Sequence, residues 1–185
     1  MSKALKKDAT YTDLCAVADN FVAEILAGEL YASPRPATPH AHAGGALFRK
    51  LGGPFQDGEN GPGGWWFLVE PELHFGADVL VPDIAGWRRE RMPTIPNAAH
   101  LTLAPDWLCE VLSPSTRTID RRKKLPIYAR EGVGHAWLID PLQKTLDVLR
   151  LDSRRWLSVA THETDAKVRV EPFEAIELPL RALSL

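Results

Sequence analysis

Two carboxylates are surrounded by apolar residues that favour β-strands. Asp83 lies in the segment Leu-Val-Pro-Asp-Ile-Ala of residues 80–85, and Glu110 lies in Trp-Leu-Cys-Glu-Val-Leu of residues 107–112. A carboxylate inside a buried strand loses its hydration, so it must be paired with a positive group or a cation. If neighbouring strands bring both groups to one point, their oxygens suit Mg²⁺. The alternative is that each carboxylate faces solvent on a one-sided sheet, and these segments alone leave both interpretations open.

A basic segment follows Glu110 and could supply the positive charge. Asp120, Lys124 and Tyr128 are spaced by four residues, so they share one face of a helix. The plain interpretation is a surface Asp–Lys pair worth about 0.3–0.5 kcal/mol beside a solvated basic face. The functional interpretation is that the Lys124 ammonium reaches the two carboxylates. The basic residues that would then bind phosphates are Arg117, Arg121 and Arg122.

The elements that must position these residues follow from the apolar pattern and the turn residues. The sequence predicts a short helix from Thr10 or Thr12 to about Phe21, a strand–turn–strand unit over residues 23–31, and a helix over residues 40–51 that ends at residues 52–54. Strands are expected at residues 65–69, 78–87, 107–112, 136–140 and 146–151, with a helix at about 117–130 closed by Gly132. A helix inserted among strands predicts an α/β or α+β fold with a central mixed sheet.

Length and composition limit the class of protein. The 185 residues suggest a single domain over residues 1–185 that buries its own core. With 45% hydrophobic residues, 25% charged residues and a net charge of −2, the chain is neither disordered nor strongly basic, although a local basic patch remains possible.

Membrane insertion and secretion are not expected. The apolar stretches have only the length of strands, and no apolar segment typical of a secretory signal follows Lys3, Lys6 and Lys7. Cys15 and Cys109 form neither a disulfide framework nor a metal knuckle, so both are expected to be reduced thiols and the chain to be cytoplasmic.

The order and spacing of several blocks resemble one family, the Uma-two restriction endonucleases of the PD-(D/E)XK nuclease superfamily. The blocks are Pro82 with Asp83, residues 105–117, Asp120 with Lys124 and Tyr128, residues 132–133, and residues 137–141. At the N-terminus, residues 24–30 resemble the family's "YELIDGEL" segment, and His40 resembles its recurrent histidine. The resemblance covers about residues 10–180.

The resemblance implies a restriction-endonuclease-like core and assigns roles to individual residues. Asp83 would be the aspartate of the "PD" block, and Glu110 the acidic residue of the "(D/E)XK" block. Leu112 stands where the lysine of that block would be, so the resemblance gives the lysine role to Lys124 on the following helix. Glu24 is implied as a further carboxylate beside the metal, although Ala23 and Ala27 replace the family's usual Tyr and Asp. The residues expected beside the site are His40, Asp120 and Tyr128.

The function expected from these observations is a metal-dependent endonuclease that hydrolyses phosphodiester bonds of DNA. Asp83, Glu110 and Glu24 would hold Mg²⁺ or Mn²⁺, and Lys124 would orient water or neutralise charge on the phosphate. A homodimer is an expectation from the prevalence of two-fold symmetry.

Two alternatives belong to other classes. A nucleic-acid-binding or structural module on the same fold, without cleavage, is compatible with the near-neutral charge and with Leu112. A glycoside hydrolase would also use two carboxylates, but it leaves the basic helix after Glu110 unexplained.

Overall fold

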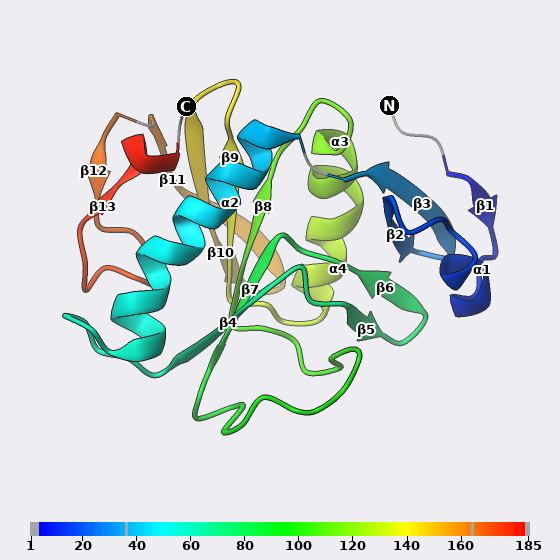
Figure 1. The fold of residues 1–185 in the computed structure, drawn as a ribbon, viewed down its shortest axis with the longest axis horizontal. Coiled ribbons are helices and arrows are strands. Elements are labelled where there is room, and N and C mark those ends of the chain that lie inside the picture. Colours follow the sequence, from blue (N-terminus) through cyan, green and yellow to red (C-terminus); the bar gives the residue numbers. More distant parts are fainter. Residues whose placement is uncertain (1–3, 36, 164, 184–185) are drawn as a thin grey trace.

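The computed structural model describes residues 4–35, 37–163 and 165–183, and two sheets organise it (Figure 1). The larger sheet contains, in spatial order, β11 (Arg155–Glu163), β10 (Thr145–Asp152), β9 (His135–Asp140), β8 (Trp107–Val111), β7 (Ile84–Arg88) and β4 (Trp65–Val69). The smaller sheet contains β1 (Lys6–Lys7), β3 (Glu29–Pro34), β2 (Phe21–Leu26), β6 (Asp78–Leu80) and β5 (Leu73–Phe75). A separate short pair joins β12 (Lys167–Val168) to β13 (Leu178–Pro179).

Helical segments cover both faces of the larger sheet, except that the first short helix packs against the smaller sheet. The segments are α1 (Tyr11–Cys15), α2 (Thr38–Leu51) with the π-turn η1 (Gly52–Asp57), the continuous series α3 (Arg117–Ile119), η2 (Asp120–Lys124) and α4 (Leu125–Arg130), and η3 (Leu180–Leu183). No helix in the described ranges is long and apolar enough to cross a membrane.

Strand β8 lies at the centre of the larger sheet and is buried on both faces. It pairs antiparallel with β7 and parallel with β9, and the α3–η2–α4 segment makes the crossover between the two parallel strands. The predicted mixed sheet flanked by helices is therefore confirmed. Trp107, Cys109 and Val111 face the core under α2, whereas Leu108 and Leu112 face the core under α3–α4. Because side chains alternate along a strand, Glu110 shares the second face.

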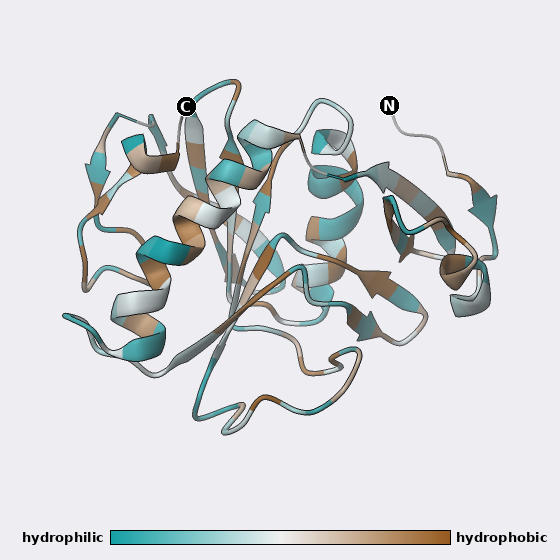
Figure 2. Cartoon of the chain, in the orientation of Figure 1, coloured by the Kyte–Doolittle hydropathy of each residue, from teal (hydrophilic) through white to brown (hydrophobic). Residues whose placement is uncertain are grey.

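The hydropathy pattern agrees with this layering. In Figure 2 the central strands are largely hydrophobic, while α2 alternates between hydrophobic and hydrophilic residues along its length. Ala43, Leu47 and Leu51 of α2 are buried at helical spacing, as the sequence predicts. Cys109 lies opposite Glu110 within the apolar core, and burial raises the pKa of its thiol well above the usual value.

The strand predicted over residues 78–87 is divided into two. Pro82 has no N–H to donate to a ladder, and the chain leaves the smaller sheet after β6 and enters the larger sheet at β7. Residues 81–83 therefore form the junction between the two sheets. This division places Asp83 at the junction rather than inside a strand.

Two predicted helix ends were wrong, and a third helix has the predicted bounds but an irregular interior. The first helix, α1, ends at Cys15, because Phe21 already begins β2. The glycines and proline at residues 52–54 do not stop α2, because the chain continues as η1 and ends at Gly58, whose φ of 74° suits glycine. The helix over residues 117–130 contains the π-turn η2 directly before Pro126, a residue that cannot donate the regular backbone hydrogen bond.

Candidate active site

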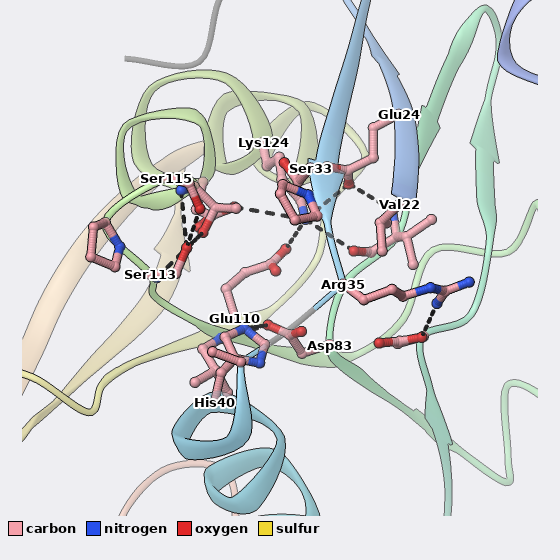
Figure 3. A pocket seen from close by; sticks show the side chains of 18 residues that line it. Val22, Glu24, Ser33, Arg35, His40, Asp83, Glu110, Ser113, Ser115 and Lys124 are labelled. Carbon is pink, nitrogen blue, oxygen red and sulfur yellow. Dashed lines mark hydrogen bonds and ion pairs between the residues drawn. The ribbon is translucent and has the colours of Figure 1, made fainter. Parts of the chain in front are cut away.

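A cleft of about 270 Å³ lies where the two sheets meet the crossover helix. Its lining comes from β2, β3, the β6–β7 junction, β8, the start of α2 and the η2 segment. Figure 3 shows Glu24, Asp83, Glu110 and Lys124 gathered around it from these separate elements. The four candidate catalytic residues predicted from the sequence therefore line one cleft, although up to 100 positions separate them in the chain.

Lys124 is the buried centre of this group. Only 3% of the residue is exposed, and its Nζ lies 2.8 Å from Glu110 Oε1, 2.9 Å from Glu24 Oε1 and 3.8 Å from Asp120 Oδ1. Nζ also donates to the Val81 carbonyl at 3.0 Å. An ammonium has three protons to donate, so these oxygens hold it in a fixed position. The surface-pair interpretation of Lys124 is therefore wrong, because the pair with Asp120 is buried.

The charge of Lys124 depends on the surrounding carboxylates. Burial alone lowers the pKa of Lys124, but the negative charges of Glu110 and Glu24 outweigh burial and hold that pKa well above its usual value. The ammonium is thus fully protonated at neutral pH. It can stabilise negative charge or orient a water molecule, but it cannot accept a proton as a general base.

Glu110 is almost fully buried on β8 and has two positive or donating neighbours. Its Oε1 accepts a hydrogen bond of 2.8 Å from the Tyr128 hydroxyl in addition to the contact with Lys124. Burial raises the pKa of Glu110 well above the usual value; Lys124 opposes this shift, and the charges of Asp120 and Asp83 add to it. The Tyr128 hydroxyl therefore fixes the orientation of the Glu110 carboxyl group. Lys124 only partly offsets the effect of burial on the ionised form of this group.

Asp83 is held at the sheet junction by the backbone of β8. Its Oδ2 accepts a 2.7 Å hydrogen bond from the Val111 N–H and lies 3.4 Å from His40 Nε2 at the start of α2. Burial lowers the pKa of His40, but the hydrogen bond and charge of Asp83 outweigh it, so the net shift is upward. Glu24 is positioned in a similar manner, because its Oε1 accepts the Val81 N–H at 2.8 Å.

Comparison with known proteins agrees with this geometry. The model of the Uma2 (Uma-two) family, described as "Putative restriction endonuclease", matches residues 8–181. The chain belongs to the Uma2 family. A crystal structure described as a putative nuclease belonging to DUF820, from Anabaena variabilis, has the same fold, with a TM-score of 0.72 and 24% identity over 95% of this chain and 97% of that one. No curated protein matches the chain. Family and fold together indicate a nuclease.

The donor set of the Uma2 cleft suits a divalent cation. Glu24, Asp83, Glu110 and Asp120 place four carboxylates around the single ammonium of Lys124, with His40 beside Asp83. Burial raises the pKa values of Glu110 and Asp120, and the charges of neighbouring carboxylates add to both shifts, so an additional positive charge would favour the ionised forms. Carboxylate oxygens are the ligands that Mg²⁺ and Mn²⁺ prefer. A cation between Asp83 and Glu110 would supply this charge.

Asp120 provides a pH-dependent measure of this charge imbalance. Burial raises its pKa to about 7, an effect that Lys124 opposes and Glu24 strengthens. Between about pH 4 and pH 7 the folded chain keeps a proton that the unfolded chain loses, so this carboxyl lowers stability as pH rises. The Asp120→Asn variant lacks this titration. The difference in free energy of unfolding between the variant and the wild type should therefore shift in favour of the variant, by on the order of 2 kcal/mol, from pH 5 to pH 8. Urea denaturation in EDTA measures this gain, and an equal difference at both pH values would contradict it.

The structure does not bring the three arginines of the basic segment into the cleft. Arg117 pairs with Asp140 at 2.5 Å, and Arg121 pairs with Asp147 at 2.5 Å. Arg122 is exposed. Among the described residues that line the cleft, none is one of these arginines. Binding of phosphates by this group remains a prediction.

A salt titration tests that prediction. If Arg121 and Arg122 contact DNA phosphates, the double variant Arg121→Ala/Arg122→Ala should flatten the dependence of log affinity on log salt by about one unit per lost contact. Fluorescence anisotropy with a labelled duplex at several salt concentrations gives the slope. A slope equal to that of the wild type would make these arginines part of a solvated face.

The cleft also contains residues that sequence reasoning missed. Arg35, which lies between two prolines in the sequence, pairs with Glu70 at 3.1 Å, and both line the cleft. The loop after β8 adds a hydroxyl group network, in which Ser113 Oγ lies 3.0 Å from Thr116 Oγ1. Arg35 lies outside every element predicted from the sequence. The available signal was an isolated cation four residues after the strand–turn–strand unit predicted over residues 23–31.

Proposed function

We propose that this Uma2 protein is a divalent-metal-dependent endonuclease that hydrolyses the phosphodiester bonds of DNA. The observation that carries the proposal is the buried Lys124 ammonium, which lies within 3 Å of Glu24 and Glu110 in a cleft shared with Asp83. A structural role for one lysine does not require two carboxylates and a further acid at a solvent-accessible junction. A site for a cation and a phosphate does require acids and a fixed positive group.

Asp83 and Glu110 are the residues proposed to hold Mg²⁺ or Mn²⁺, with Glu24 as the third acid. When bound, the cation supplies Lewis-acid stabilisation of the phosphoryl oxygens and makes water more acidic. The Val111 N–H orients Asp83 and the Tyr128 hydroxyl orients Glu110, so both ligands are positioned before the cation binds. His40 is proposed to orient Asp83, and Asp120 to adjust the charge around Lys124.

Lys124 is proposed to stabilise negative charge on the scissile phosphate. In the structure its contacts already go to Glu24, Glu110 and the Val81 carbonyl. The ammonium can therefore donate to a phosphate or to water only when one of these contacts is released. The contact with Glu110 is the one for which a cation would compete, so occupancy of the metal site and availability of Lys124 are linked.

Cleavage of a supercoiled plasmid tests the proposal, because a circular substrate has no ends and only an endonuclease can cut it. We expect nicked or linear product with Mg²⁺ or Mn²⁺, none with EDTA, and none for Asp83→Asn with either cation. Asp152→Asn, an exposed acid in β10, is the matched control and should keep full activity. If the wild type binds duplex DNA equally with Mg²⁺ and EDTA and never cuts, the chain is a non-cleaving nucleic-acid-binding module.

Two further properties are part of the proposal. A homodimer would let two sites cut both strands, and sedimentation analysis measures this state directly. A cytoplasmic location is proposed because DNA is the proposed substrate.

A further inference from the structure

A second group of metal-ligating side chains lies outside the cleft lining described above. Glu72 precedes β5, His74 lies within β5, and His100 lies in the connection between β7 and β8. The candidate ligand atoms of these residues all lie within 4.8 Å of one another. The group combines two imidazoles with one carboxylate, whereas the cleft offers mainly carboxylates.

Backbone pairing fixes the positions of the three residues. The His74 N–H donates to the Leu101 carbonyl at 2.8 Å, and the Leu101 N–H donates to the Glu72 carbonyl at 2.9 Å. Leu73 and Leu101, which form the bridge between these segments, are buried. Since side chains alternate along an extended strand, Glu72 and His74 point to the face opposite Leu73, and His100 lies beside them.

The side chains are already arranged around one point. The His74 and His100 rings are stacked, with centroids 3.8 Å apart and an interplanar angle of 15°. Glu72 Oε1 lies 2.7 Å from His74 Nε2, and the same oxygen accepts a 2.9 Å hydrogen bond from the Tyr11 hydroxyl. Tyr11 also packs edge-on against His74, with ring centroids 4.9 Å apart. An outer hydrogen bond to a ligating carboxylate is typical of metal sites.

We propose that Glu72, His74 and His100 bind a transition-metal ion of the Zn²⁺ class. Two imidazole nitrogens and a carboxylate oxygen form a three-ligand set that Zn²⁺ accepts, with a remaining position for water. Ligands of one zinc ion lie at most about 4.2 Å apart, twice the usual bond length. Because the two imidazole rings are stacked, the exposed His100 ring must also turn out of the stack so that a ring nitrogen points at the ion.

The bound ion would connect three parts of the chain. Residues 89–106 join β7 to β8 without a named helix or strand, and the ion would attach this connection to β5 through His100. Tyr11 extends the attachment to α1 through Glu72. The proposed site is thus structural, and it stabilises the smaller sheet and the long connection rather than supplying chemistry to the cleft.

Isothermal titration of the full chain with Zn²⁺ in excess Mg²⁺ tests the site, because Mg²⁺ prefers oxygen ligands and competes for the carboxylate cleft. We expect one Zn²⁺ per chain, and at least about a tenfold loss of affinity for His100→Ala and His74→Ala. Tyr11→Phe should weaken binding by about tenfold through Glu72. His162→Ala, in the distant strand β11, is the matched control and should bind as the wild type does.

Two further measurements separate this site from the cleft. Co²⁺ in the same site should give the intense visible absorption of a four-coordinate ion, which His100→Ala removes and Asp83→Asn retains. Zn²⁺ should also raise the melting temperature of the wild type but not that of His100→Ala, whose circular dichroism checks folding. Equal Zn²⁺ affinity in His100→Ala and His162→Ala would overturn the proposal, as would Zn²⁺ binding that excess Mg²⁺ abolishes.

Discussion

Lys124→Met is expected to abolish plasmid cleavage and to lower the free energy of unfolding by about 3–5 kcal/mol. The variant removes the ammonium that lies within 3 Å of both Glu24 and Glu110, and it leaves these buried carboxylates without that positive partner. Some of them will then take up protons, so part of the loss should disappear at low pH. Urea denaturation at pH 5 and pH 8, together with the cleavage assay, measures both effects.

Lys123→Met is the matched control for this variant. Lys123 is the neighbouring residue, but its side chain is 42% exposed and pairs at 3.0 Å with Glu29 outside the cleft lining. Its loss should cost less than about 1 kcal/mol and leave cleavage intact. Mg²⁺ should stabilise Lys124→Met more than it stabilises the wild type, because the cation supplies charge to the same carboxylates. An active Lys124→Met, or equal inactivation by Lys123→Met, would remove Lys124 from the catalytic group.

The apolar pattern correctly predicted a buried acid at Glu110 in β8, whereas Asp83 lies partly exposed at the junction between β6 and β7 rather than inside a strand. An acid inside a run of apolar strand residues is costly, and the structure shows the expected compensation by Lys124, Tyr128 and the Val111 N–H. Assignment of Lys124 and Glu24 to the same site required the family resemblance. Neither residue lies near Asp83 in sequence, and no periodic pattern reports contacts between different elements.

The features that could not be predicted depend on tertiary context. Pro82 marks a break, but only the pairing of β6 with β2 and of β7 with β8 shows that the chain changes sheets there. The π-turn η2 adds one residue to the helical turn that carries Asp120 and Lys124. The spacing of residues in the sequence predicts a regular helix and does not reveal this extra residue. The pairing of Arg35 with Glu70 likewise follows from the meeting of β3 with the β4–β5 connection.

Asp83→Asn is expected to weaken Mn²⁺ binding by more than about tenfold and to leave the fold intact. The asparagine side chain keeps an oxygen that can accept the Val111 N–H, so the link between the sheet junction and β8 is preserved. It also removes a negative charge that raises the pKa of Glu110, so the free energy of unfolding without metal should stay equal or rise. Calorimetric titration with Mn²⁺ measures the affinity, and Asp152→Asn should bind as the wild type does.

The same variant has a second readout that needs no metal. The pKa of His40 is raised by the hydrogen bond and charge of Asp83 against the lowering effect of burial, so Asp83→Asn should lower it. An NMR titration of the His40 ring in the metal-free protein follows this change, with His162 as an internal reference. A lowered His40 pKa together with unchanged Mn²⁺ affinity would show that Asp83 is placed as described but does not bind the cation. The proposed metal site would then have to be built on Glu110 and Glu24 alone, and a site with only these two acids would share both of its ligands with Lys124.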